Sequence, residues 1–130
     1  MLNLTGAGDE FRQVALIAVQ EQIPRKFLEG IMGDLRRAKL VDAQRGKLGG
    51  YRLARPAGMI SFAEVMRVVD GPLALLPCAS RHFYSRCDDC IDERTCVIRG
   101  LMAKVRNEVS DILDRTSLAD ALKDNTLLLW

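Results

Sequence analysis

The sequence predicts a mainly α-helical protein with a small β-wing, in which a winged helix-turn-helix head precedes one long helix. Three observations lead to this fold class. Two apolar periodic stretches flank a short break, two strand-like runs flank a glycine-rich turn, and an apolar stripe of helical spacing occupies the last third. At 130 residues, the chain has room for one domain and an appended helix.

The first part of the chain predicts two helices with a break between them. Met1–Asp9 holds two glycines and no periodic pattern, so we expect a loose lead-in. Phe11–Val19 shows helical apolar spacing, and Pro24 suits the first turn of a second helix over Pro24–Ala38. The expected buried face of this second helix consists of Phe27, Leu28, Ile31, Leu35 and Ala38.

Two short strands, Leu40–Ala43 and Tyr51–Ala54, are predicted on either side of a basic turn, Arg45–Gly50. The glycines of this turn, Gly49 and Gly50 among them, allow a tight bend and a close approach of backbone to a phosphate. Arg45 and Lys47 place positive charge at the tip, where a narrow minor groove would attract it. The alternative is an ordinary hairpin with a solvated tip.

The charge of the chain is unevenly distributed. Ten basic and four acidic residues lie between Arg12 and Arg55, a net charge of +6, so the remainder carries −4 in a chain of +2 overall. A basic front half is typical of a domain that faces phosphates. A solvated basic surface without a partner is the alternative.

The second half predicts two more helices. Ser61 and Glu64 form a capping-box pattern for a helix that ends at Val69, before Asp70-Gly71-Pro72. A helix over about Val97–Arg115 would be roughly 28 Å long. We expect its apolar stripe to bury against a second copy of the chain, with packing inside one chain as the alternative. The stripe consists of Ile98, Leu101, Met102, Val105, Val109, Ile112 and Leu113.

All four cysteines, Cys78, Cys87, Cys90 and Cys96, lie within nineteen residues, spaced C-x8-C-x2-C-x5-C. The sequence shows neither a signal-peptide pattern nor an apolar run long enough to span a membrane, so we expect a cytoplasmic protein. In that compartment, clustered cysteines favour metal binding or redox activity over structural disulfides.

Four thiolates can hold a [2Fe–2S] or a [4Fe–4S] cluster. Structural zinc is disfavoured because only one C-x2-C step is present, and a metal-free thiol switch is a third possibility. His82 or Asp88 would complete the ligand set if one cysteine does not bind. Three arginines, Arg81, Arg86 and Arg94, would lie near a cluster and favour thiolates.

Several stretches together resemble the Rrf-two (Rrf2) family of bacterial winged-helix regulators, which includes the iron–sulfur-assembly repressor and the nitric-oxide-sensing repressor. The most specific of them is Arg45-Gly46-x-x-Gly49-Gly50-Tyr51, followed by Arg52-Leu53-Ala54-Arg55-Pro56. The others are Phe27-Leu28-Glu29, Leu35–Val41, Ile60-Ser61-Phe62, Val69-Asp70-Gly71 and Thr116–Leu122. The resemblance covers about Phe11–Leu122. It implies a dimeric transcription regulator, in many members one that reads an iron–sulfur cluster.

Carried over to this chain, the resemblance makes Pro24–Ala38 the recognition helix in the major groove of DNA. It implies guanine or phosphate contacts for Arg25 and Lys26, and a cytosine contact for Glu29. Arg36 and Arg37 would contact phosphates or face solvent, and Arg45 would enter the minor groove. Lys47, Gly49, Gly50 and Tyr51 complete the expected DNA-binding set. The chain departs from the family at its start, where ten residues stand in place of a long basic-aromatic helix.

These observations divide the chain into a winged helix-turn-helix domain (11–72), a cysteine-rich cluster loop (73–96), and a dimerisation helix with its closing element (97–122). The expected function is that of a homodimeric DNA-binding regulator, a repressor, that senses iron–sulfur, redox or nitric-oxide status. An enzyme is disfavoured because the chain has one histidine and no phosphate-binding loop or Ser/His/Asp constellation. The remaining rival is a cofactor-free interaction protein.

Overall fold

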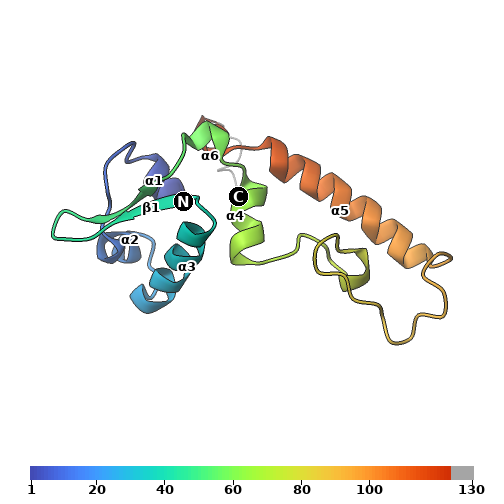
Figure 1. Cartoon of the computed structure of the whole chain (residues 1–130). Helices are drawn as coiled ribbons and strands as arrows, with labels where there is room; N and C mark the ends of the chain where they lie inside the picture. Colours follow the sequence, from blue (N-terminus) through green and yellow to red (C-terminus); the bar gives the residue numbers. More distant parts are fainter. Residues whose placement is uncertain (124–130) are drawn as a thin grey trace.

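The computed structural model describes residues 1–123 and consists of a rounded head from which an arm extends (Figure 1). The head contains the N-terminal helices, the wing and the C-terminal helix. The arm contains one long helix with an irregular loop running beside it. The elements are α1 (Leu2–Thr5), α2 (Val14–Gln20), α3 (Arg25–Arg37), β1 (Val41–Gln44), β2 (Gly50–Leu53), η1 (Ala57–Met59), α4 (Phe62–Val69), η2 (Pro77–Ala79), α5 (Val97–Arg115) and α6 (Leu118–Lys123).

The core of the head forms between α2, α3, β1 and the two ends of the described chain. Its buried side chains are Leu4, Ile17, Ala18, Leu28, Met32, Leu35, Leu40, Val41, Ile60 and Leu118. Helix α3 contributes the residues at i, i+4 and i+7 of one face, Leu28, Met32 and Leu35, as an amphipathic helix should. The core therefore fixes the orientation of the exposed face of α3.

The wing is a two-stranded antiparallel sheet in which Val41 pairs with Leu53 and Gln44 with Gly50. Strand β1 lies one residue later than the sequence predicts, and β2 lies one residue earlier. Backbone hydrogen bonds of 2.8 Å in both directions join Arg12 to Tyr51 along the outer side of β2. The segment before α2 thereby holds the wing against the helix-turn-helix.

Helix α4 begins with the predicted capping box. The Glu64 N–H donates to the Ser61 hydroxyl at 3.2 Å, and the Ser61 N–H donates to the Glu64 carboxylate at 3.0 Å. Ser61 also forms a β-bridge with Ser117, just before α6. After leaving the head as α5, the chain therefore returns, and Leu118 of α6 joins the core.

The arm is formed by α5, which has the predicted bounds, and by the loop from Asp70 to Cys96. The predicted apolar stripe of α5 is split between two environments. Met102, Val105 and Leu113 are half-buried, whereas Ile98, Leu101 and Ile112 are more than half exposed. Over the described residues, every helix is too short or too polar to cross a membrane.

The structure corrects the expected start of the chain. Met1–Asp9 is not a loose lead-in, because α1 lies there and the Leu4 side chain is only 1% exposed in the core. The next helix begins at Val14 rather than at Phe11, since Arg12 is engaged by the wing. A leucine-containing turn of four residues is too short to give a periodic pattern, which explains the error.

Two further expectations about burial were wrong. Phe27 is 65% exposed and Ala38 is exposed, although both were assigned to the buried face of α3. Val19 of α2 is also exposed.

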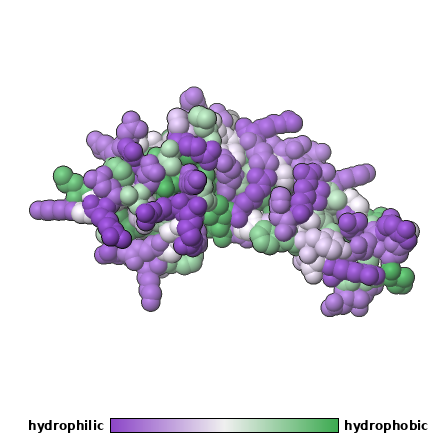
Figure 2. All heavy atoms as spheres, in the orientation of Figure 1, coloured by the Kyte–Doolittle hydropathy of each residue, from purple (hydrophilic) through white to green (hydrophobic). Residues whose placement is uncertain are grey.

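Figure 2 shows that hydrophobic atoms on the visible face lie in small patches within a largely hydrophilic surface. The sequence also predicts a frayed tail over Asn125–Trp130, and these residues lie outside the part of the chain that the structure describes.

Candidate DNA-binding surface and cysteine loop

A groove of about 430 Å³ separates α3 from the wing. Six of the ten residues expected to bind DNA line it, namely Arg25, Arg36, Arg45, Gly49, Gly50 and Tyr51. Three guanidinium groups from α3 and the wing therefore converge on one concave surface. Such an arrangement can neutralise phosphates while the exposed face of α3 lies along a groove of the duplex.

The four other expected residues lie outside this lining. Lys26 and Lys47 are exposed, on the first turn of α3 and at the wing tip. Glu29 accepts a 2.8 Å hydrogen bond from Arg25 of the same helix, so these two side chains form an i,i+4 pair. Arg37 pairs with Asp34 on the exposed surface. Adjacent Arg36 and Arg37 thus have different surroundings.

The tight end of the wing depends on two glycines. A Cβ atom on Gly49 would collide with the carbonyl of Gln44, and one on Gly50 would collide with the carbonyl of Arg12. Gly50 also has φ of +148°, which side chains disfavour. Gln13 fixes the tip from outside, since its amide donates to the Lys47 carbonyl at 2.8 Å.

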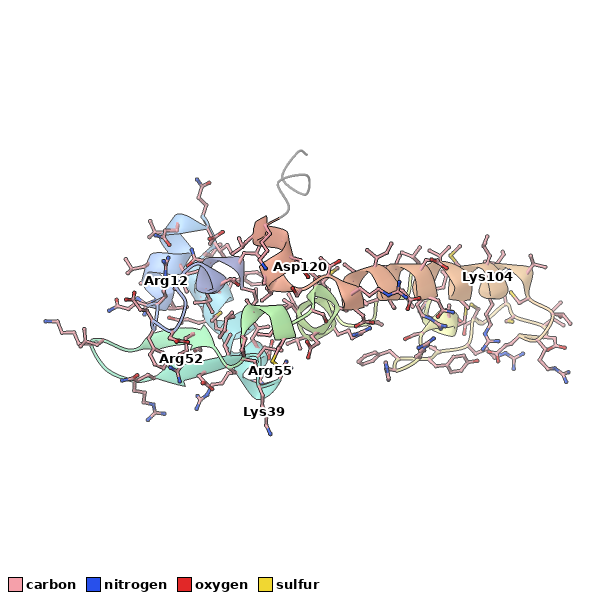
Figure 3. The ribbon with its side chains drawn as sticks, turned by 90° about the horizontal axis from the view of Figure 1, so that it is seen from above. Arg12, Lys39, Arg52, Arg55, Lys104 and Asp120 are labelled. Atoms are coloured by element: carbon pink, nitrogen blue, oxygen red, sulfur yellow. The ribbon has the colours of Figure 1, made fainter. Side chains whose placement is uncertain are left out.

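Sequence reasoning missed the support that the N-terminal segment gives to this surface. The Arg52 guanidinium lies 4.8 Å from the centroid of the Phe11 ring and within 3.6 Å of the Asp42 carboxylate. Figure 3 shows Arg12 and Arg52 on the wing side of the head, with Lys39 projecting from the same region. Contacts so distant in sequence leave no periodic signal.

The four cysteines are free thiols with different exposure. Cys78 lies on η2 and is 5% exposed, Cys87 is exposed, and Cys90 and Cys96 are half-buried. Cys96 is the N-cap of α5, and its Sγ accepts from the Arg99 N–H at 3.4 Å.

Three of these thiols are close enough to influence one another. A side-chain hydrogen bond with Cys78 raises the pKa of the Cys87 thiol, and loss of hydration and the negative charges of Cys78, Cys96 and Asp88 raise it further. Cys90 is attached to this group through the turn in which its N–H donates to the Cys87 carbonyl at 3.2 Å.

The chemistry of four unpaired thiols fits a thiolate-bound cluster or metal. Their geometry fits less well, because within residues 1–123 no three His, Cys, Asp or Glu side chains are arranged as ligands of one ion. The donor set is thus suitable in kind, while its atoms are not gathered at one point.

The three arginines expected near a cluster form hydrogen bonds to carbonyl, amide and carboxylate oxygens. Arg86 donates to the carbonyls of Cys90, at 2.6 Å, and Ile91, at 3.2 Å. Arg94 pairs with Asp92, and Arg81 donates to Asn107 of α5. His82 is exposed and lines a cavity between α4 and α5.

Arginines of α5 hold η2 against the long helix. Arg99 Nε donates to the Cys78 carbonyl at 3.0 Å, and Arg106 donates to the Ala79 carbonyl. At the other end of α5, Asp114 accepts two hydrogen bonds of 2.8 Å from Arg67 of α4. A continuous set of polar contacts thus joins the buried cysteine, the long helix and the head.

A helix-turn-helix with a wing, basic on the side of α3, defines the class of winged-helix transcriptional regulators. A sequence model for a family of transcriptional regulators, described as iron-dependent, matches residues 1–124. The chain belongs to the Rrf2 family, whose members regulate transcription and are not enzymes. This match begins at residue 1. It therefore includes the ten residues that, by the sequence alone, stand in place of the family's long first helix.

Two curated relatives support this assignment. An rrf2-like HTH-type transcriptional regulator of Rhodobacter capsulatus is 43% identical over 106 residues, which are 82% of this chain and 71% of that protein. The HTH-type transcriptional regulator IscR of Vibrio campbellii is 30% identical over 115 residues. The matched residues are 88% of this chain but only 65% of the Vibrio protein.

Solved structures of the family have the same fold. IscR of T. potens superposes with a TM-score of 0.73 at 26% identity, covering 99% of this chain and 82% of that one. CymR, described as the global cysteine regulator of B. subtilis, superposes with a TM-score of 0.72 at 28% identity, covering 92% of this chain and 84% of that one.

Proposed function

We propose that this protein is a homodimeric transcriptional repressor that binds duplex DNA through α3 and the wing and senses its signal through the cysteine loop. The observation that carries the DNA-binding part is the groove in which Arg25, Arg36 and Arg45 converge. The glycine-supported wing beside α3 has the form expected for simultaneous contact with two neighbouring grooves of the duplex. Lys26, Glu29 and Lys47 would contact DNA from the rim of this surface, whereas Arg37, which pairs with Asp34, would face solvent.

Binding to duplex DNA and its salt dependence test this part. Fluorescence anisotropy should give a binding constant whose logarithm falls linearly with the logarithm of salt concentration, because each phosphate contact releases counterions. A duplex selected from a random library should bind more tightly than a scrambled one of equal length. Weak binding that does not depend on salt would contradict the proposal and favour a cofactor-free interaction protein.

The dimer would form along α5. Its exposed apolar residues Ile98, Leu101 and Ile112 lie on one side of the helix and would be buried by the same residues of a second copy. Leu101→Glu should therefore yield a monomer by analytical ultracentrifugation. Leu48→Glu, at a still more exposed leucine of the wing, should leave the dimer intact.

The cysteine loop is proposed to hold an iron–sulfur cluster, with zinc as a less favoured occupant. Cys78, Cys87 and Cys96, whose thiols influence one another, would bind it, and Cys90 would be the fourth ligand. Such a cluster supplies one-electron redox chemistry and reactivity toward oxidants. The family description and the IscR relatives support this choice.

The chain's own contacts suggest how the loop would act on DNA binding. Arg99 and Arg106 tie the carbonyls of η2 to α5, and Asp114 ties α5 to Arg67 in the head. A change in the cysteine loop would shift α5 and with it the spacing of two recognition helices in the dimer. Half-sites on DNA tolerate little change in that spacing.

Anaerobic purification with a visible spectrum and iron, sulfide and zinc analysis tests the occupant. Visible absorption with matching iron and sulfide, lost in a Cys78→Ser variant, is expected. Stoichiometric zinc would make the loop structural. Protein that stays colourless and metal-free after anaerobic reconstitution would overturn the cluster.

A metal-free thiol switch is a second candidate, which the influence of Cys78 on the pKa of the Cys87 thiol favours, because it requires the two side chains to be near each other. A peroxide would oxidise one thiolate to a sulfenic acid, releasing hydroxide, and the other thiol would displace water to form a disulfide. Mass spectrometry after hydrogen peroxide treatment should then find Cys78 linked to Cys87. Equal linkage among all four cysteines would contradict this candidate.

A further inference from the structure

A cavity of about 310 Å³ lies between α4 and α5. The loop that contains η2 runs beside the long helix (Figure 1). Its volume is at the lower end of the range of roughly 300–1,000 Å³ for small-molecule pockets. Leu73 and Phe83 provide apolar lining, and Ser80, Arg81, Arg106 and Asn107 provide polar lining.

Two guanidinium groups of this cavity share one neutral acceptor. Arg81 Nη2 donates to Asn107 Oδ1 at 3.0 Å, and Arg106 Nη2 donates to the same oxygen at 2.7 Å. The two positive charges therefore lie close together, which is unfavourable unless an anion offsets their repulsion. An amide oxygen carries only a partial charge.

The carboxylates that line the cavity form no ion pair with these two arginines in the part of the chain that the structure describes. Asp114 accepts both of its hydrogen bonds from Arg67, at 2.8 Å each. Asp111 lines the cavity as well. Within residues 1–123, neither it nor any other carboxylate forms an ion pair with Arg81 or Arg106.

We propose that this cavity binds a small organic anion, whose carboxylate or phosphate group is held by Arg81 and Arg106. Guanidinium forks match the oxygens of both groups in geometry and charge. The Asn107 amide nitrogen can add a third donor, and Phe83 and Leu73 would cover the apolar part of the ligand. Binding does not depend on DNA binding or on an occupant of the cysteine loop.

Isothermal titration calorimetry on the full-length, reduced chain tests this site with succinate and inorganic phosphate as separate probes. One saturable site per chain is expected, and the tighter probe identifies the preferred anion. Arg81→Gln should weaken binding at least about tenfold, the size expected for loss of a charged hydrogen bond. Arg94→Gln, a matched change at a loop arginine that pairs with Asp92 outside the cavity, should not.

A second variant distinguishes loss of anion binding from loss of folding. Asn107→Asp places a carboxylate between the two arginines, so it should abolish anion binding while thermal stability is kept or increased. Absence of a saturable signal for either probe up to roughly 10 mM would overturn the proposal, since weaker binding carries little free energy. Equal weakening in Arg81→Gln and Arg94→Gln would also overturn it, because attraction would then be unspecific.

Discussion

Arg99 of α5 is hydrogen-bonded to Cys78 of η2, with its Nε donating to the backbone carbonyl at 3.0 Å. The backbone N–H of the same arginine donates to the Cys96 sulfur at 3.4 Å. One residue thus contacts the most buried cysteine through its side chain and the helix-capping cysteine through its backbone. The position of Cys78 relative to α5 depends directly on this arginine.

Arg99→Gln should expose the Cys78 thiol. The variant loses a charged hydrogen bond that is partly shielded from water, and we expect about 1 kcal/mol less stability for η2 against local opening. This corresponds to about fivefold faster reaction of Cys78 with a thiol reagent, because the buried sulfur reacts only from the opened state. Mass spectrometry of the labelled peptides measures the rate at each cysteine.

Arg94→Gln is the control, because Arg94 lies in the same loop, is exposed, and forms its ion pair with Asp92. It should leave the Cys78 labelling rate unchanged. If Arg99→Gln accelerated labelling of Cys87 and Cys90 but not of Cys78, the hydrogen bond to the carbonyl would have no part in holding η2.

The elements of this fold could be predicted because each has a local cause. Residues close together in the sequence determine the capping box of Ser61 and Glu64, the apolar stripe of α5 and the glycine turn of the wing. The errors lie where tertiary contacts decide. Leu4 is buried because α1 packs against α6, which is distant in the sequence, and no local sequence pattern predicts this contact. Phe27 has the right spacing for the core but remains exposed.

The candidate sites show the same division. The residue types of the wing and the spacing of the cysteines are enough by themselves to indicate DNA and thiolate chemistry. The groove that unites Arg25 with Arg45 depends on how the wing folds against α3, and the pairing of Arg99 with Cys78 spans twenty-one residues. Sequence spacing gives no information about contacts of this kind.

Asp114→Asn should lower the stability of the protein at neutral pH by about 0.5–1 kcal/mol, a value discounted because the pair with Arg67 is partly exposed. The hydrogen bonds from Arg67 lower the pKa of the Asp114 carboxyl. A lowered pKa stabilises the fold above the unfolded value of about 3.9, and this gain is lost as pH falls through the folded value.

The stabilities of the native chain and of Asp114→Asn, measured by urea unfolding, should therefore differ at pH 7 and approach each other as the pH falls below about 3.9. A double-mutant cycle with Arg67→Gln at pH 7 isolates the coupling between the two side chains. A difference that persisted undiminished at acid pH would assign the effect of Asp114 to packing instead of charge.

Gly50→Ala should open the end of the wing. The added methyl group meets the Arg12 carbonyl, a backbone atom that cannot move without breaking the bridge to Tyr51. We expect a loss of about 2 kcal/mol or more in the free energy of unfolding, from strain at positive φ together with this collision. Gly58→Ala is the control, since its Cβ would meet only the Ala119 methyl at 3.9 Å, and it should be nearly neutral.

Arg36→Gln and Arg37→Gln should affect DNA binding very differently, although the two residues are adjacent. Arg36 lines the groove between α3 and the wing, whereas Arg37 pairs with Asp34 on the exposed surface. In a dimer, Arg36→Gln removes two phosphate contacts, so the salt slope of duplex binding should fall by about 1.8 and the affinity by about tenfold. Arg37→Gln should change the affinity less than about twofold. Anisotropy titrations over a salt series measure both quantities, and a larger effect of Arg37 would place the DNA on the other side of α3.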